Sequence, residues 1–471
     1  MTGSPLRRSR LLGRTRHVHM VGIGGIGMSG IAEILLRLGF VVSGSDLKRS
    51  ELTEHLQRLG ARIYEGHAPE HVHGADVVVY SSAVRPEENP ETREARRLRI
   101  PTIRRAEMLA ELMRLKYGIG IAGTHGKTTT TSMVGLVVAR GGYDPTIIVG
   151  GRVGVFGTNA VPGSGDLIVV EADEYDRTFL QLSPTWAVLT TLDLEHTDIY
   201  SSLEELEEAF LTFASKVPFY GSVILCLDDA NLPRLLPRLE RRVVTYGFSP
   251  QADFRAVGVG LDRFYSAFTV LHGERALGRV RLSVPGRHNV QNALAAIAVG
   301  LELEIDFPTI VETLASFTGV ERRFQLRGEH GGVIWVDDYA HHPTEVQATL
   351  EAARSGWPDR RLVVVFQPHL YSRTRDLFLD FARAFLNADV LLVLDIYPAR
   401  EQPIPGVSST LIVDAARRFG HRHVHYVADR AELEEHLARW LLPGDMLLSM
   451  GAGDVYRIVQ EAWTRWGARQ G

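Results

Sequence analysis

The chain has 471 residues, among them 45 glycines and one cysteine, and 52 lysines and arginines against 56 aspartates and glutamates, a formal charge of −4. This balance argues against a nucleic-acid partner, and the dense arginines between Arg93 and Arg105, which lack interleaved aromatics, are expected to form a solvated helix face. Cys226 lies in an apolar run, which predicts a buried strand residue in a reducing compartment. No apolar stretch approaches the roughly 18 residues that cross a bilayer, so we expect a cytoplasmic protein without membrane insertion.

Short β-branched runs alternate with helical patterns along the chain. Helices are expected from about Gly27 and from about Lys127. The expected strands of the first third are residues 18–21, 40–44, 77–80 and 118–122. This alternation predicts βαβ units around parallel sheets. The length predicts about three domains, and composition changes near residues 115 and 322 place them at 1–115, 116–322 and 323–471.

The first glycine turn (residues 22–27) has the pattern Gly-x-Gly-x-x-Gly between an expected strand and an expected helix. Glycines in this pattern let backbone amides approach a diphosphate at a helix N-terminus. Asp46, at the end of the next strand, can accept a hydrogen bond from a ribose hydroxyl. The pattern indicates a nucleotide without saying which one: a dehydrogenase is the default interpretation, and a tight turn that binds nothing is the structural alternative.

The phosphate loop (residues 123–128) reads Gly-Thr-His-Gly-Lys-Thr. The strict P-loop pattern requires glycine where Ile121 stands, so the pattern itself fails. Its physical requirements are met, because a strand ends in a loop whose amides can surround phosphate oxygens. Lys127 can reach the terminal phosphates, and the Thr128 hydroxyl can bind magnesium. The loop therefore predicts a nucleoside triphosphate site.

Carboxylates follow two further apolar runs. Glu171 ends one run, and His196 comes shortly after the other, behind Asp193. We expect Glu171 and His196 to lie at the carboxyl ends of adjacent strands beside Thr128, where ligands gather in open α/β sheets. These groups suit Mg²⁺, although histidine is an unusual ligand for it. A loop histidine with a purely structural hydrogen bond is the alternative for His196.

Several later motifs carry polar groups at strand and helix ends. Asn289 and Asn292 present two amides on one helix face, suited to an adenine edge, or else a helix cap and a solvent-exposed amide. Of the adjacent His341 and His342, one is expected to act and the other to pack. The turn at Gly451 is expected to be merely tight.

In combination these motifs resemble the Mur ligases. The matching segments are residues 22–30 (GIGGIGMSG), 123–130 (GTHGKTTT), 171–176 (EADEYD), 193–200, 286–293 (GRHNVQNA), 322–324, 337–345 (DDYAHHPTE) and 366–376. They span almost the whole chain in the family's order. The resemblance implies three α/β domains: an N-terminal Rossmann-like domain for a UDP-sugar, a central P-loop ATPase-type domain, and a C-terminal Rossmann-like domain that closes over ATP and receives an amino acid.

The resemblance also implies roles for individual residues. The UDP-sugar, rather than NAD, would contact Gly22, Gly24, Gly25, Gly27, Asp46, His67, Ser81 and Ser82. ATP would contact Gly123, Thr124, His125, Gly126, Lys127, Thr128, Thr129, Asn292, Arg323 and Asp338. Magnesium would be held by Thr128, Glu171 and His196, and the amino acid by His341, His369 and Arg373. Lys127, His341 and His196 would be catalytic, with either histidine as the base.

The implied reaction joins L-alanine to the lactyl carboxylate of UDP-N-acetylmuramate, using ATP and Mg²⁺, through an acyl phosphate, in peptidoglycan precursor synthesis. A monomer or weak dimer is expected. Two positions depart from the family pattern: Ala340 replaces a frequent glycine, and Leu370 replaces an arginine found in some members. The second departure removes a possible partner for the carboxylate of alanine, so Arg373 and His341 would carry more of its recognition.

Three other interpretations stay open. A sibling ligase that adds D-glutamate or a preformed peptide would share the ATPase core. A dehydrogenase built on the first glycine turn would leave the phosphate loop unexplained. A non-catalytic nucleotide-gated binding protein would fit the loops but gives no reason for Glu171, His196 and His341 to cluster.

Overall fold

A computed structural model describes residues 12–153, 158–194, 199–399 and 401–468. The chain forms two compact units, described separately below: the first contains Met1–Arg255, Val270–Leu277 and Gln291–Leu314, and the second contains Ala256–Thr269, Gly278–Val290 and Ala315–Gly471. Within the described residues, no helix combines the length and the apolar character that a membrane crossing needs.

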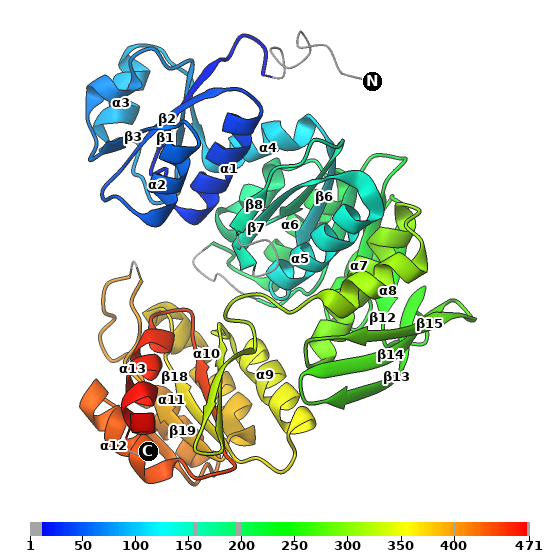
Figure 1. The fold of residues 1–471 in the computed structure, drawn as a ribbon, viewed down its shortest axis with the longest axis vertical. Coiled ribbons are helices and arrows are strands. Elements are labelled where there is room, and N and C mark those ends of the chain that lie inside the picture. The colour runs from blue at the N-terminus through cyan, green and yellow to red at the C-terminus, as the bar shows by residue number, and fades with distance from the viewer. Residues whose placement is uncertain (1–11, 154–157, 195–198, 400, 469–471) are drawn as a thin grey trace. The chain divides into compact units, whose positions relative to one another are not determined.

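The N-terminal part of the first unit is a parallel five-stranded sheet in the order β3-β2-β1-β4-β5, drawn in blue in Figure 1. Its elements are β1 (His17–Val21), α1 (Ile26–Arg37), β2 (Val41–Asp46), α2 (Glu51–Arg58), β3 (Arg62–Glu65), β4 (Val77–Tyr80), α3 (Pro90–Arg97), β5 (Thr102–Arg104) and α4 (Arg105–Arg114). The predicted strands and the helix near Gly27 are confirmed. The Asn89 side chain caps α3, with Pro90 at the first helical position, where proline costs no hydrogen bond.

The central sheet has ten strands in the order β15-β14-β13-β12-β11-β10-β6-β9-β7-β8. Its strands are β6 (Tyr117–Ala122), β7 (Thr146–Val153), β8 (Thr158–Val161), β9 (Leu167–Glu171), β10 (Trp186–Leu189), β11 (Ser222–Cys226), β12 (Val243–Gly247), β13 (Phe254–Asp262), β14 (Tyr265–His272) and β15 (Arg275–Leu282). Its helices are α5 (Lys127–Val138), α6 (Leu203–Ser215), α7 (Arg287–Glu302) and α8 (Phe307–Ser316). Cys226 is buried, as predicted, and burial raises the pKa of its thiol to about 12.

The order of the central strands corrects one prediction. β9, which ends at Glu171, and β10, whose following loop contains Asp193, are not adjacent: β6 lies between them, paired with β10 at Leu189 and with β9 at Glu171. The sequence expectation was wrong because consecutive strands of an α/β sheet need not be neighbours. The phosphate loop therefore leaves the sheet between the two polar strand ends.

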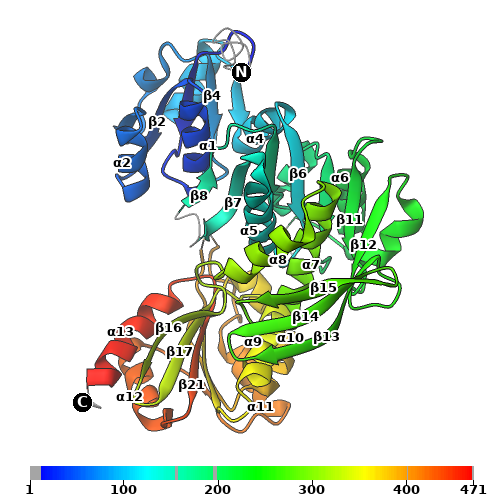
Figure 2. The ribbon, with the colours of Figure 1, turned by 45° about the vertical axis from the view of Figure 1, so that its right-hand side comes forward.

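The second unit contains a six-stranded sheet in the order β16-β17-β21-β18-β19-β20, with only β16 antiparallel to its neighbour. Figure 2 labels β16, β17 and β21 of this sheet. Its strands are β16 (Gln325–His330), β17 (Val333–Asp338), β18 (Leu362–Phe366), β19 (Val390–Val393), β20 (Val424–Tyr426) and β21 (Met446–Met450). Its helices are α9 (Pro343–Gly356), α10 (Tyr371–Ala384), α11 (Thr410–Arg418), α12 (Arg430–Trp440) and α13 (Val455–Ala468). Residues of α9, α10 and α11 pack in one apolar core and those of α12 and α13 in another, so both faces of the sheet are covered.

Candidate functional site

The phosphate loop joins β6 to α5, as predicted from the sequence. Gly123 has a φ of +153°, and a Cβ there would stand 1.9 Å from the Thr190 hydroxyl oxygen. Gly126 has a φ of +78° and precedes α5, whose N-terminus has no side-chain cap. A glycine at this position offers no side chain to cap the helix, and an uncapped helix N-terminus is an arrangement that receives a phosphate.

Lys127 is held inside this loop by oxygen atoms of the protein. Its ammonium donates to both carboxylate oxygens of Glu174, at 2.9 and 2.8 Å, and to the Gly123 carbonyl oxygen at 2.6 Å. The Glu174 side chain is only 1% exposed. A nucleotide phosphate would compete with Glu174 for this ammonium. Glu174 was not among the predicted site residues, although it lies in the same acidic segment as Glu171.

Thr128 and Glu171 form a pair of oxygen ligands beside the loop. The Thr128 hydroxyl donates to Glu171 Oε1 at 3.0 Å, and the Gly150 N–H donates to Glu171 Oε2 at 2.6 Å. Burial raises the pKa of Glu171, while the Gly150 hydrogen bond and the Lys127 charge oppose that rise. Hydroxyl and carboxylate oxygens are the donors that Mg²⁺ prefers, and a cation here would favour the ionised carboxylate, so these residues fit the metal.

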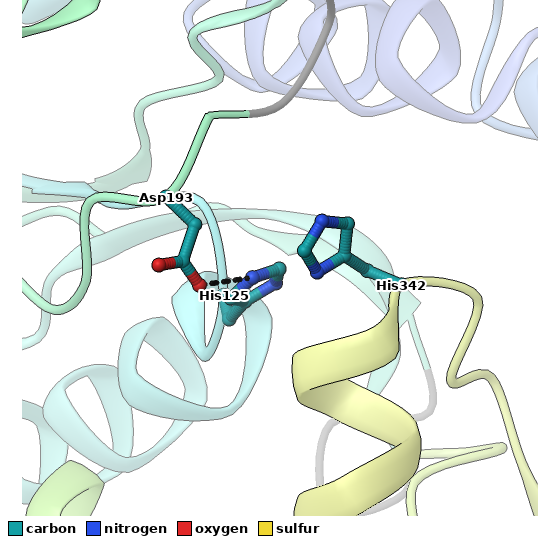
Figure 3. Close-up of side chains that lie close together, drawn as sticks. All are labelled: His125, Asp193 and His342. Atoms are coloured by element: carbon teal, nitrogen blue, oxygen red, sulfur yellow. Dashed lines mark hydrogen bonds and ion pairs between the residues drawn. The ribbon is translucent and has the colours of Figure 1, made fainter. Parts of the chain in front are cut away.

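The loop after β10 contributes a second polar cluster. His125 Nε2 lies 3.0 Å from a carboxylate oxygen of Asp193 (Figure 3), and the His125 N–H donates to the Thr191 hydroxyl at 2.8 Å. Thr124 also contacts this loop, because its hydroxyl accepts from the Asp193 N–H. The predicted ligand His196 lies outside the described residues, so its position relative to Glu171 stays a prediction.

Asn292 reaches the start of α5 from α7. Its side-chain oxygen accepts from the Thr130 hydroxyl at 3.0 Å, and a Cβ on Gly126 would stand 2.8 Å from the same oxygen. Thr129 is buried beside it in α5. Asn292 therefore lies at the phosphate loop, and recognition of adenine remains a proposal. Asn289 instead donates to the Pro285 carbonyl oxygen at 2.6 Å, a contact local to the start of α7.

The first glycine turn is closed by Asp46 and bordered by Ser81. The Gly24 N–H donates to Asp46 Oδ2 at 2.8 Å, so this carboxylate already binds one amide of the turn. Gly22 has a φ of +79°, and a Cβ there would stand 2.8 Å from the Ser81 hydroxyl oxygen. Gly25 and Ser82 are exposed. α1 begins after Gly25 without a side-chain cap, as α5 does after Gly126.

His67 lies next to this turn and contacts a buried carboxylate. Its Nδ1 is 3.0 Å from the Ser45 hydroxyl oxygen and 3.3 Å from Glu91 Oε2. Glu91 is fully buried; burial alone would raise its pKa, but the nearby His19 ring and the hydrogen-bond contacts with Ser45 and His71 outweigh burial and lower the pKa to about 2. The sequence analysis gave Glu91 no role, because its contacts are with Ser45 and His71, which lie 46 and 20 residues away in the chain.

In the second unit, the predicted ATP ligands Arg323 and Asp338 lie at the end of β17. Asp338 accepts from the Phe324 and Ala340 N–H groups, each at 2.7 Å. Burial raises the pKa of Asp338 to about 6, although the nearby Arg323 charge lowers it. Arg323 donates to Glu345 Oε1 at 3.3 Å. Two backbone amides thus fix the orientation of the Asp338 carboxylate.

One of the two adjacent histidines of this unit packs in the protein interior, as predicted. His342 is buried and caps α9, with its ring accepting from the Thr344 N–H (Figure 3). His341 is partly exposed; its Nδ1 lies 3.1 Å from Glu345 Oε2 and 3.0 Å from the Tyr339 carbonyl oxygen. Two acceptors at Nδ1 favour the tautomer with the proton there, which makes Nε2 the basic nitrogen.

The other two predicted amino-acid ligands, His369 and Arg373, follow β18, which β21 separates from β17. The rings of His341 and His369 are 5.9 Å apart, and Arg373 Nη1 lies 3.3 Å from His369 Nδ1. Leu370, between them in sequence, has a φ of +74°, a strained conformation for a leucine. The structure therefore brings His341, His369 and Arg373 together within this unit.

Parallel sheets with a lysine-bearing glycine loop define a nucleotide-binding protein of the P-loop class. Comparisons with known families extend this: residues 17–117 match the Mur ligase family catalytic domain, residues 121–300 the Mur ligase middle domain, and residues 322–453 the Mur ligase glutamate ligase domain. The chain belongs to the Mur ligase family.

Individual relatives cover nearly the whole chain. A protein of Salinibacter ruber named UDP-N-acetylmuramate--L-alanine ligase is 57% identical over 453 residues, which are 96% of this chain and 95% of the relative. A protein of Geobacter sp. with the same name is 56% identical over 95% of this chain and 97% of its own length. The crystal structure of UDP-N-acetylmuramate-alanine ligase from Thermotoga maritima matches with a TM-score of 0.79 and 29% identity, covering 96% of this chain and 99% of that one.

Proposed function

We propose that the protein joins L-alanine to the lactyl carboxylate of UDP-N-acetylmuramate, with ATP, in the cytoplasmic synthesis of peptidoglycan precursors. The observation that carries this proposal is the phosphate loop with Lys127, Thr128 and Glu171, in a chain whose full-length relatives bear that name. The dehydrogenase alternative offers no use for this loop. We retain residues 115 and 322 as the proposed domain boundaries.

A carboxylate does not acylate an amine at neutral pH, because oxide is too poor a leaving group. The γ-phosphoryl group of ATP is therefore transferred to the lactyl carboxylate, and the amine of alanine attacks the resulting acyl phosphate. Lys127 binds the phosphate oxygens and neutralises the charge that develops on them. Magnesium, held by Thr128 and Glu171, supplies further charge neutralisation when bound. Collapse of the tetrahedral intermediate gives the amide and inorganic phosphate.

The amine of alanine must lose a proton before or during its attack. His341 is the base that we favour, because Glu345 and the Tyr339 carbonyl oxygen both face Nδ1 and leave Nε2 as the basic nitrogen. Arg373, beside His369, would bind the carboxylate of alanine. Asp338, with its orientation fixed by two backbone amides, would accept from a ribose hydroxyl of ATP.

The test is phosphate release that requires both UDP-N-acetylmuramate and L-alanine, with the amide product identified by mass spectrometry. Parallel assays with D-glutamate and with a tripeptide separate the sibling ligases. Phosphate release without either substrate, or without incorporation of alanine, would overturn the proposal.

Lys127→Ala supplies the matching loss-of-function test. It should reduce kcat by about 10³-fold or more, because a charge that stabilises the transition state is removed. UDP binding, measured by calorimetry, should stay unchanged, since the first glycine turn is a separate site. A variant that retained wild-type kcat would show that the loop does not carry the reaction.

A further inference from the structure

Glu91 is the hub of a buried hydrogen-bond network beside the first glycine turn. Its Oε2 accepts from the Ser45 hydroxyl at 2.5 Å and lies 3.3 Å from His67 Nδ1. Its Oε1 lies 2.7 Å from His71 Nδ1. The Glu91 side chain has no exposure to solvent, whereas His67 keeps 17% exposure. The network therefore joins a buried charge to a histidine that reaches the surface of the site.

The hydrogen-bond directions in this network fix the proton on His67. The Ser45 hydroxyl gives its proton to Glu91, so the Ser45 oxygen is an acceptor toward His67 Nδ1, 3.0 Å away. The Glu91 carboxylate can only accept as well. With two acceptors facing Nδ1, the His67 proton belongs on Nδ1, and Nε2 carries a lone pair.

The position of His67 in the chain places it at the proposed nucleotide site. It follows β3 by two residues, and Ser45 is the next-to-last residue of β2, beside Asp46. The Gly66 N–H donates to the Asp46 carbonyl oxygen at 2.8 Å, which ties the two strand ends together. Asp46 in turn binds the Gly24 N–H of the first glycine turn. The carboxyl ends of β1, β2 and β3 thus hold Asp46 and His67 at one edge of the sheet.

We propose that Glu91 is a positioning residue for the UDP-sugar: it fixes His67 in the Nδ1-protonated form, so that Nε2 accepts a hydrogen bond from a donor of the uridine. This inference rests on the proposed function, because it assigns the nucleotide of that substrate to this edge of the sheet. The uridine offers two kinds of donor, the ribose hydroxyls and the uracil N3–H. A neutral pyrimidine or ribose donor suits Nε2, whereas a phosphate oxygen, which only accepts, does not.

The test uses Glu91→Gln, which keeps the size of the side chain but adds N–H donors. Binding of UDP, measured by calorimetry, should weaken about tenfold or more, because the His67 tautomer is no longer fixed and one hydrogen bond to the ligand is lost or opposed. In steady-state assays KM for UDP-N-acetylmuramate should rise, while kcat and the KM values for ATP and L-alanine stay within twofold. Glu91→Asp, which keeps the carboxylate, should recover part of the UDP affinity.

Glu94→Gln is the matched control. Glu94 lies one helical turn further along α3 and also contacts a histidine, His73, at 3.2 Å, but it lies outside the network. It should leave UDP binding unchanged. If Glu91→Gln does not fold, Ser45→Ala and Glu91→Asp replace it: the first removes one of the two acceptors that face His67 Nδ1, the second moves the other away, and each should weaken UDP binding.

Nitrogen NMR of the His67 ring measures its tautomer and so tests the positioning role of Glu91 directly. The wild-type protein should show a protonated Nδ1 and a bare Nε2, and Glu91→Gln should shift the ring toward the other tautomer. Binding of 2′-deoxy-UDP, 3′-deoxy-UDP and N3-methyl-UDP identifies the donor, since loss of the contacted group should remove the difference between wild type and variant. A folded Glu91→Gln variant with wild-type UDP affinity, or an unchanged His67 tautomer, would overturn the inference. Failure of the wild-type protein to bind UDP would overturn the proposed function instead.

Discussion

Glu91 and Glu171 are two carboxylates of the first unit whose surroundings shift their pKa values in opposite directions. Glu91 lies beside the first glycine turn, where hydrogen bonds from a hydroxyl and from histidines overcome burial and lower its pKa to about 2. Glu171 lies beside the phosphate loop, where burial raises its pKa against one amide, one hydroxyl and the Lys127 charge. The protein's own hydrogen bonds thus stabilise the ionised form of Glu91. For Glu171 they do not fully offset the cost of burial, and a bound cation would stabilise its ionised form further.

This difference distinguishes a carboxylate that stabilises the fold, Glu91, from one that we expect to bind a ligand, Glu171. A carboxylate that is fully hydrogen-bonded stabilises the fold and orients its neighbours. A carboxylate whose ionised form is disfavoured in the free protein gains most from a bound cation. Removing the Glu171 charge should therefore lower activity more than stability, and removing the Glu91 charge should lower stability.

Of the two carboxylates, Glu171 should have the larger effect on activity: Glu171→Gln should lower activity strongly and have little effect on the fold. We expect kcat to fall by about 10²–10³-fold, because the proposed magnesium ligand beside the transferring phosphoryl group would be lost. The thermal midpoint without magnesium should not fall, since the wild-type carboxylate is not fully satisfied there. Phosphate-release assays across magnesium concentrations and thermal unfolding measure both. Asp166→Asn, an exposed neighbour just before β9, is the control, and a large loss of stability in Glu171→Gln would contradict the comparison.

Glu91 should make the fold sensitive to acid. Its pKa is about 2 in the folded protein against an ordinary value of 4.5. Because the folded value is lower, the ionised carboxylate contributes stability that is complete above the unfolded pKa and is lost as the pH falls from about 4.5 toward about 2. The difference corresponds to roughly 3 kcal/mol.

Urea unfolding at pH 7 and pH 3 checks this, with Glu91→Gln beside the wild type. The wild-type advantage in the free energy of unfolding should shrink at pH 3, because the Glu91 carboxyl of the unfolded chain is then protonated while that of the folded protein is still mostly ionised, which favours unfolding. An advantage of the same size at both pH values would show that Glu91 is not the source.

The two glycine sites also differ in the origin of their positive charge. The phosphate loop contains Lys127, whereas the first glycine turn contains no basic residue. Arg105 instead lies against it from α4, with Nη1 2.7 Å from the point where a Cβ on Gly27 would stand. Arg105 is half-buried, so it departs from the solvated face expected for the arginine segment.

Arg105→Ala should therefore weaken the binding of UDP by about 10–100-fold, the value of one charge-assisted hydrogen bond. Binding of uridine, which has no diphosphate, should change much less. Calorimetry with both ligands measures the difference, and Arg104→Ala, at an exposed neighbour, is the control. An equal loss for uridine would place Arg105 away from the diphosphate.

The smallest expected effect concerns Glu174, whose carboxylate accepts hydrogen bonds from the Lys127 ammonium in the absence of nucleotide. Glu174→Gln should tighten ADP binding by a few-fold, because the phosphate no longer competes with a carboxylate for the ammonium; a charged hydrogen bond of about 1 kcal/mol net corresponds to about fivefold. Calorimetry with ADP in the absence of magnesium checks this. Weaker binding in the variant would mean that Glu174 assists the nucleotide rather than competing with it.

The sequence by itself determined the parts of the protein that are encoded locally. The phosphate loop follows from six consecutive residues, because a strand, a glycine loop and a helix carry their geometry in their own backbone preferences. The alternation of strands and helices predicted parallel sheets built from βαβ units for the same reason. It also predicted that Thr128 and Glu171 would meet, since the carboxyl ends of parallel strands share one edge of a sheet.

Only the tertiary structure decided which distant side chains complete each site. Glu174 lies 47 residues from Lys127, and Glu91 lies 46 residues from Ser45. No periodicity or motif in the sequence predicts either contact, because each depends on how separate loops and helices pack. The order of the central sheet is of the same kind: β6 separates β9 from β10, and no local pattern encodes which strands become neighbours. The sequence thus determined which polar side chains stand at each strand end. The packing determined which of their charges have protein partners that stabilise the fold and which can still bind a ligand.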